Sequence, residues 1–113
     1  MTETESCMQS LIDSIKSTKE YNQYHSLLLR VKAQPELYAR IGDYHRRSLA
    51  LQMNGSPNII QDNNNLQNEY MDLQNNGLSN EFLAAEHQYC TMIRKLQHKF
   101  IESVEIETDF LEE

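Results

Sequence analysis

Apolar residues recur at steps of three and four along most of this chain, the spacing that places side chains on one face of an α-helix. The first such segment runs from about Thr4 to Lys16. Its apolar positions are Met8, Leu11, Ile12 and Ile15. The stretch Ser17-Thr18-Lys19-Glu20 then resembles a capping box, in which a hydroxyl side chain and a glutamate satisfy free amides at a helix start. A second helix is predicted from Thr18 to about Ala33, either separate from the first or continuous with it through a kink.

The middle of the chain predicts two further helices, the first with clear start and stop signals and the second without a clear start signal. Pro35 suits the first turn of a helix, where its missing amide costs nothing, and Asn54-Gly55 is a typical left-handed ending. The next segment contains the run 62–65, whose Asp and Asn side chains compete for the backbone and form helices poorly. We therefore expect a flexible start after Asn58 and a helix only from about Leu66 to Asn75.

The last predicted helix is the longest, from a cap at Ser79 to about Val104. Its apolar positions are Phe82, Ala85, Tyr89, Met92 and Leu96. A sustained three-four alternation favours packing against antiparallel helices at shallow angles. The predicted fold is all-α: an antiparallel helical bundle of about four to five helices with a long C-terminal helix, forming one domain over residues 1–104.

Composition supports helices and leaves the assembly open. Turn-forming residues are scarce, with 2 Pro and 3 Gly, which argues against a sheet-rich fold. The apolar fraction of 39% is somewhat low for a compact monomer. Two interpretations follow: a small elongated bundle, or a protomer that completes its core by pairing with another copy.

The net charge of −7 is concentrated near the end of the sequence. Residues 102–113 include Glu102, Glu105, Glu107, Asp109, Glu112 and Glu113 and contain no Lys or Arg. Residues 105–113 therefore form an acidic C-terminal tail, either a solubilising segment or a docking segment for a basic partner. Because acidic side chains repel phosphate, the tail argues against direct binding of nucleic acid.

Neither a secretory signal nor a membrane span is predicted. The first ten residues are acidic and polar, and no apolar run approaches the ~20 residues that a span needs. We expect a cytoplasmic protein with Cys7 and Cys90 reduced. Cys90 lies beside the apolar positions of the last helix, so we expect it to be a small buried hydrophobe.

The sequence shows no catalytic motif: it lacks a Gly-rich phosphate loop, a nucleophile elbow and a Walker-type lysine. None of its histidines, His25, His45, His87 and His98, lies three or four residues from another. Two weaker ligand pairs are His87 with Cys90 and His98 with Glu102, too few to close a metal site without ligands from elsewhere. We predict no catalytic residue, cofactor or metal. A small enzyme or metal carrier that uses these side chains is the alternative hypothesis.

Two basic clusters are the candidate docking residues: Arg46 with Arg47, and Arg94, Lys95 and Lys99. On a helix, Lys95 and Lys99 share a face. The simplest interpretation is a solvated face. The functional one is a docking patch for an acidic partner surface, including a second copy of the chain. An RNA-binding role for the same five residues is a third, weaker hypothesis.

Three blocks of sequence resemble the YlbF/YmcA family of bacterial regulators. They are residues 17–24 (STKEYNQY), residues 35–52 (PEL followed by YHRR and LQ) and residues 78–86 (LSNEFLAAE). The blocks occur in the family's order and at fitting spacing, and the resemblance spans about Leu11 to Ser103. Gln34 stands where the family often has an Asp helix cap, and an acidic tail replaces the Cys-rich tail of some members.

The resemblance implies a helical protein that commonly self-associates and is not a catalyst. Family members are linked to competence, sporulation and biofilm formation. The best-known ones act with the protein YaaT on messenger-RNA processing by ribonuclease Y. We therefore expect a non-catalytic regulatory adaptor whose partners are itself and other regulatory proteins of the YlbF, YmcA or YaaT kind, without direct contact to nucleic acid or membrane.

Overall fold

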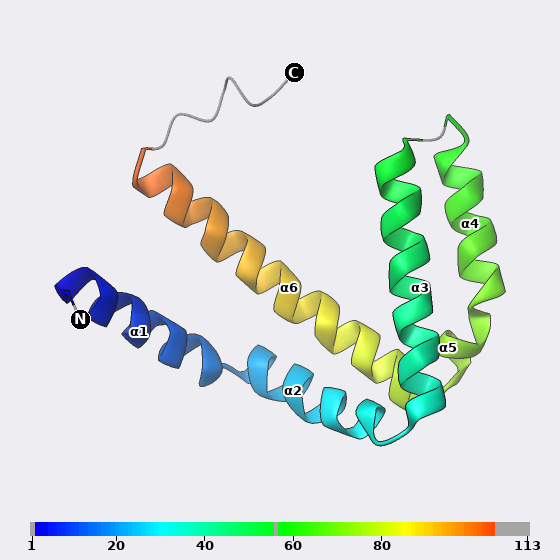
Figure 1. Ribbon diagram of the computed structural model, residues 1–113, viewed down its shortest axis with the longest axis horizontal. Helices are drawn as coiled ribbons and strands as arrows, with labels where there is room; N and C mark the ends of the chain where they lie inside the picture. The colour runs from blue at the N-terminus through cyan, green and yellow to red at the C-terminus, as the bar shows by residue number, and fades with distance from the viewer. Residues whose placement is uncertain (1, 56, 106–113) are drawn as a thin grey trace.

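A computed structural model describes residues 2–55 and 57–105, and these residues form six helices and no strand (Figure 1). This confirms the predicted all-α class and the long final helix. The helices are α1 (Glu3–Lys16), α2 (Lys19–Lys32), α3 (Pro35–Asn54), α4 (Ile59–Glu69), α5 (Met71–Asn75) and α6 (Gly77–Ser103).

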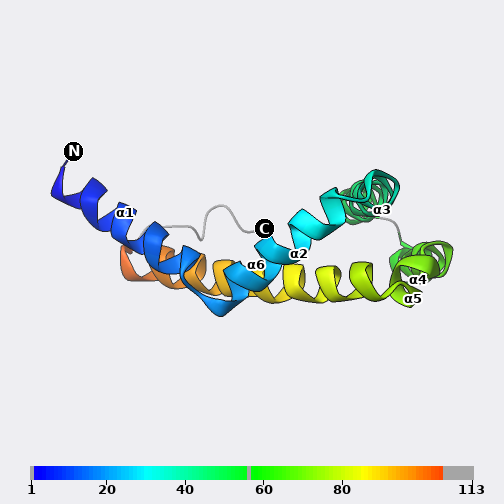
Figure 2. The same cartoon turned by 90° about the horizontal axis from the view of Figure 1, so that it is seen from below.

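The helices form two antiparallel pairs that meet at a corner, with α2 along the first part of α6 and α3 along α4 (Figures 1 and 2). The described residues extend over 48 × 39 × 19 Å, with a radius of gyration of 17.7 Å. A compact domain of this length would have a radius of about 13 Å. The arrangement is thus open, with the α3–α4 hairpin projecting from one end of the α2–α6 pair.

The buried core lies at the corner where the two pairs meet. One buried side chain comes from each of α2, α3, α4 and α5, joined by Tyr70 between α4 and α5 and by the start of α6. These residues are Val31, Ile41, Leu66, Tyr70, Leu73 and Phe82. Neighbouring tyrosines and leucines, including Tyr24 and Tyr44, pack against this cluster while half-buried. The corner therefore holds the fold together.

A break at Ser17-Thr18 separates α1 from α2. Of the two alternatives that the sequence left open, the structure therefore has two separate helices and not one kinked helix. The Thr18 hydroxyl accepts a hydrogen bond from the Tyr21 amide at 3.2 Å, as an N-cap does. The Ser17 hydroxyl instead donates to the Asp13 carbonyl at 3.0 Å. Glu20 is one position too early to close a capping box on Thr18, so only half of that motif forms.

Two predicted details around α4 and α6 were wrong. The run 62–65, expected to be flexible, lies inside α4, because burial of Leu66 against the core outweighs the poor helix propensity of its neighbours. Asn76, not Ser79, caps α6, with its side-chain oxygen accepting from the Ser79 amide at 3.1 Å. Ser79 itself is buried inside the first turn and donates its hydroxyl proton to the Leu73 carbonyl.

The expectation that Cys90 is buried was also wrong: the side chain is exposed, as is that of Cys7. Successive residues of a helix point about 100° apart. Tyr89 takes the position that packs against α2, where its ring lies 5.1 Å from that of Tyr24. Cys90 therefore falls at the edge of this contact.

Candidate interaction surface

The cations predicted on α3 have different environments, and Arg47 takes part in the fold itself. Its guanidinium donates to the Glu69 carboxylate at 2.6 Å and to the Tyr70 hydroxyl at 3.2 Å. Beside this arginine the pKa of Glu69 is lowered. Arg46 is more exposed and has a longer contact, 3.7 Å, with Asp43. Of this cluster, Arg46 is thus the cation more available to another molecule.

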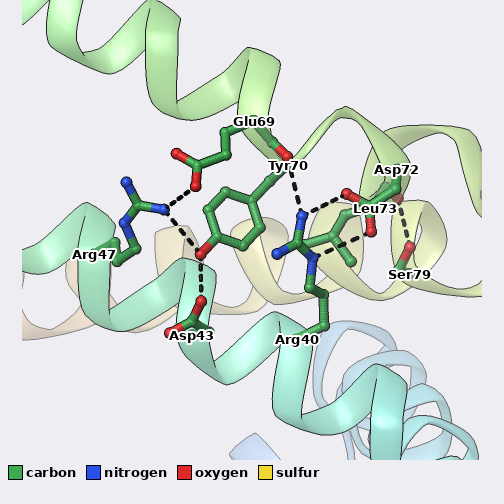
Figure 3. Close-up of polar contacts among 8 residues, drawn as sticks. All are labelled: Arg40, Asp43, Arg47, Glu69, Tyr70, Asp72, Leu73 and Ser79. Carbon is green, nitrogen blue, oxygen red and sulfur yellow. Dashed lines mark hydrogen bonds and ion pairs between the residues drawn. The ribbon is translucent and has the colours of Figure 1, made fainter.

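A polar network around Tyr70 joins α3 to α4 and α5, and Figure 3 shows its ring between the guanidinium groups of Arg40 and Arg47. The carbon of the Arg40 guanidinium lies 4.0 Å from the ring centroid. The Tyr70 hydroxyl donates to Asp43. The ring is only 2% exposed, so the network satisfies a buried hydroxyl and orients the hairpin on the corner.

Arg40 makes the second half of this network. It binds the Asp72 carboxylate through two nitrogens, at 3.2 and 3.0 Å, and the Glu69 carbonyl at 3.0 Å (Figure 3). This contact lowers the pKa of Asp72. The sequence interpretation missed Arg40, Asp43, Glu69 and Asp72. Their three-residue spacings, from Arg40 to Asp43 and from Glu69 to Asp72, beside the apolar positions of two neighbouring helices were the available signal.

The cations on α6 lie on a different element from Arg46 and Arg47, so the structure does not gather the five predicted residues into one patch. Arg94, Lys95 and Lys99 are all exposed on the second half of α6. Lys95 and Lys99 line an open groove between α6 and the start of α2. Arg94 lies 3.5 Å from the Thr91 hydroxyl. Lys95 and Lys99 thus lie beside the exposed Leu96, whereas Arg94 is not among the residues that line this groove.

A further difference from a closed bundle lies at the end of the molecule opposite the hairpin. There α1 and the second half of α6 diverge, and the described residues of α1 include none that is buried. Large apolar side chains stay exposed on both helices, from 37% for Ile12 to 50% for Phe100. We call this surface the open end and define it by Met8, Leu11, Ile12, Leu96, Phe100 and Val104.

Such an uncovered apolar surface is the sign of a contact site. Large contiguous apolar patches are rare on monomeric proteins, and those rimmed by polar groups often mark sites of protein interaction. Here Lys95 and Lys99, which line the groove together with Leu96, supply charged groups beside the apolar surface. The geometry therefore suits the binding of an amphipathic helix with acidic flanks.

The two candidate metal-ligand pairs, His87 with Cys90 and His98 with Glu102, lie in different environments. His98 lies 3.3 Å from Glu102 on the exposed surface of α6, and His87 lines the groove. Within residues 2–55 and 57–105, no group of three or more His, Cys, Asp or Glu side chains is placed to hold a metal ion. Over the same residues, no helix has the length and hydropathy that would let it cross a membrane.

His45 provides one further contact between the two helix pairs. Its Nε2 lies 2.8 Å from the Glu86 carboxylate, which links α3 to α6, and the contact raises the pKa of the imidazole. The atom is enclosed and makes no hydrogen bond of ordinary geometry within the described residues, so the link is an ion pair that forms when His45 is protonated.

Fold and surface together define a small helical protein with exposed apolar and basic side chains on α6. The chain belongs to the family described as control of competence regulator ComK, YlbF/YmcA, whose model matches residues 6–105. This is a regulatory family, and the match confirms the resemblance drawn from the three sequence blocks. No curated protein matches this chain significantly, and no solved structure does.

Proposed function

We propose that this protein is a non-catalytic regulatory adaptor that acts in the cytoplasm through protein–protein contacts and associates with itself through the open end. The observation that carries the proposal is the exposure of Leu11 and Phe100 on two diverging helices, at 42% and 50%. Since about half of each side chain is already covered, burying the rest is worth about 1 kcal/mol each, which contributes to the driving force for assembly. Membership of a regulatory family supports the same role.

The basic residues would then select the partner rather than supply most of the binding energy. Lys95 and Lys99 lie beside Leu96 of the open end, Arg94 is a further exposed cation of α6, and exposed ion pairs contribute only about 0–1 kcal/mol each. Charge complementarity does raise association rates and suppress wrong partners. Arg46 is a second docking residue, on α3, whereas Arg47 serves mainly to hold the hairpin.

Light scattering coupled to size-exclusion chromatography tests the self-association. We expect a species larger than the 13.3 kDa protomer at micromolar concentration. Leu11→Glu and Phe100→Glu should each convert it to the protomer, because each places a charge in the contact. Leu49→Glu is the matched control, since Leu49 is 57% exposed but lies on the α3–α4 hairpin. A strictly monomeric wild-type protein, or an assembly unaffected by both open-end variants, would contradict the proposal.

The adaptor role is tested by affinity purification of the wild-type chain and of Phe100→Glu from the native host, followed by mass spectrometry. We propose that the partners are regulators of the YlbF, YmcA or YaaT kind, acting on ribonuclease Y-dependent RNA processing and so on competence, sporulation or biofilm formation. Recovery of these proteins with the wild type and their loss with the variant is the expected result. Recovery that is identical with both chains would exclude the open end as the adaptor surface.

A further inference from the structure

The groove between α2 and α6 has an unusual combination of linings. Its apolar part comes from Met92 and Leu96, and three lysines, Lys19, Lys95 and Lys99, lie around them. Among the described residues of this lining, the only carboxylate is that of Glu20. The groove is open to solvent along its length, so an extended segment of chain could enter it from the side.

The three lysines have no ion-pair partner among residues 2–55 and 57–105. Elsewhere in the described chain, most of the arginines form ion pairs with carboxylates: Arg40 with Asp72, Arg47 with Glu69 and Arg46 with Asp43. Glu102, the acidic residue nearest to Lys99 in sequence, instead contacts His98. The groove thus presents three unneutralised cations around an apolar lining.

The chain itself contains a segment with the complementary composition. Residues 105–113 combine acidic with large apolar side chains and include no Lys or Arg. The acids are Glu105, Glu107, Asp109, Glu112 and Glu113, and the apolar residues are Ile106, Phe110 and Leu111. Both features of the groove therefore have a counterpart in this segment.

The described end of α6 favours a change of direction. Glu105 has a φ of 57°, the left-handed conformation that ends helices and turns the chain away from the helix axis. The last turn of α6 has no basic residue, and the negative end of a helix disfavours acidic side chains that follow it. Acidic side chains that follow this helix end therefore gain by pairing with cations elsewhere, and Lys99 lies about one turn before Ser103 on α6.

The distances permit this contact within one chain. At 1.5 Å per residue, Lys99 and Lys95 lie about 6 and 12 Å back along α6 from Ser103. Eight residues in extended form span up to about 26 Å. Residues 106–113 can therefore run back along α6 past Leu96 and Met92.

We propose that residues 106–113 dock in this groove of the same chain, with their acids on Lys95, Lys99 and Lys19 and their apolar side chains on Met92 and Leu96. Each exposed ion pair contributes little, but a short tether gives an effective concentration in the millimolar range. A docked segment covers Leu96 and the two cations beside it. In so far as the proposed function holds, it competes with partners for part of the open end.

Paramagnetic relaxation in the full chain tests the docking directly. A nitroxide on Thr108→Cys, with Cys7→Ser and Cys90→Ser, should strongly broaden the NMR signals of Met92 and Leu96. Lys95→Glu with Lys99→Glu should restore these signals, and so should added salt, which screens exposed charges. Arg30→Glu, which changes an exposed cation of α2 outside the groove, should leave the broadening unchanged.

Three results would overturn the inference. One is the absence of broadening at the groove, and another is broadening that persists in the double lysine variant. The third comes from mixing spin-labelled chains with isotope-labelled, spin-free ones: broadening of Met92 in the second chain at equal strength would place the segment on another copy. The first two readouts need neither a partner nor self-association, so they remain interpretable if the proposed adaptor role fails. The mixing experiment uses Leu11→Glu chains, so that contact through the open end does not itself bring the label near Met92 of the second chain.

Discussion

The corner and the open end have the same helical spacing of apolar residues, but these residues are buried at the corner and exposed at the open end. At the corner, Val31, Tyr70 and Leu73 are at most 2% exposed, because helices from both pairs converge there. At the open end, Leu11 on α1 and Phe100 on α6 have the same helical periodicity and stay about half exposed. Burial is thus decided by how many helices reach a region, and an apolar stripe alone does not specify it.

The comparison separates two roles for the apolar residues. Those at the corner provide the stability of the protomer, supported by the network of Arg40, Asp43 and Arg47 around Tyr70. Those at the open end contribute little to the isolated protomer and are available for association. Substitutions in the two regions should therefore act on different quantities: the free energy of unfolding for the corner, and the free energy of association for the open end.

The largest effect is expected for Tyr70→Ala. Removing a buried aromatic side chain leaves a cavity and should lower the free energy of unfolding by about 3–5 kcal/mol. Tyr70→Phe keeps the ring and loses only the hydroxyl contacts, so its cost should be about 1–2 kcal/mol. Urea denaturation followed by circular dichroism measures both. A Tyr70→Ala cost no greater than that of Tyr70→Phe would show that the corner is not the stabilising region.

A smaller effect is expected for Phe100→Ala at the open end. Because half of this side chain is exposed, the dilute protomer should lose no more than about 1 kcal/mol. The same denaturation experiment at higher protein concentration should show a larger difference from wild type, since unfolding is then linked to dissociation. If the difference in unfolding free energy between Phe100→Ala and wild type were the same at all protein concentrations, the open end would not act through association.

The smallest effect is expected for the ion pair of His45 and Glu86, which ties α3 to α6 beside the corner. Glu86 raises the pKa of His45 in the folded protein, so folding favours the protonated form. The contribution to stability is then full below the unfolded pKa of about 6.5 and is lost as pH rises through the folded pKa. Since both side chains are partly exposed, it should not exceed about 1 kcal/mol.

The measurement for this pair is the difference in unfolding free energy between wild type and His45→Gln as a function of pH. The difference should shrink as pH rises above about 6.5. The effect of His45→Gln should not depend on pH in this way when it is measured in a Glu86→Gln background, because the carboxylate that raises the pKa of His45 is then absent. A difference that grows with pH would contradict the assigned contact.

Sequence periodicity was enough to predict the helical class and the positions of α1, α2 and α3, because helix signals are local. The tyrosines Tyr24, Tyr44 and Tyr70 pack in or against the core. Periodicity could not predict the helix at residues 62–65, whose stability comes from Leu66 packing on the core. Nor could it assign the cap of α6, since Asn76 and Ser79 are both good caps and only the chain path chooses between them.

The contact surface was harder to predict than the fold. The basic clusters were visible in the sequence, but which of their cations stay available depends on contacts between distant segments, such as Arg47 with Glu69. The open end could not be predicted at all, because the pattern of Met8, Leu11 and Ile12 is that of a helix with a covered face. The low apolar fraction, which allowed a protomer with an incomplete core, was the one hint.

The break at Ser17-Thr18 makes α1 a self-contained unit with its own start and stop. Thr2 caps its beginning through a bond from the Glu5 amide, and Thr18 begins the next helix independently. Since no side chain in Glu3–Lys16 is buried, a different amphipathic helix could replace α1 without disturbing the corner. Exchange of this arm should therefore cost folding almost nothing. The same junction offers a place to graft a new recognition helix by design.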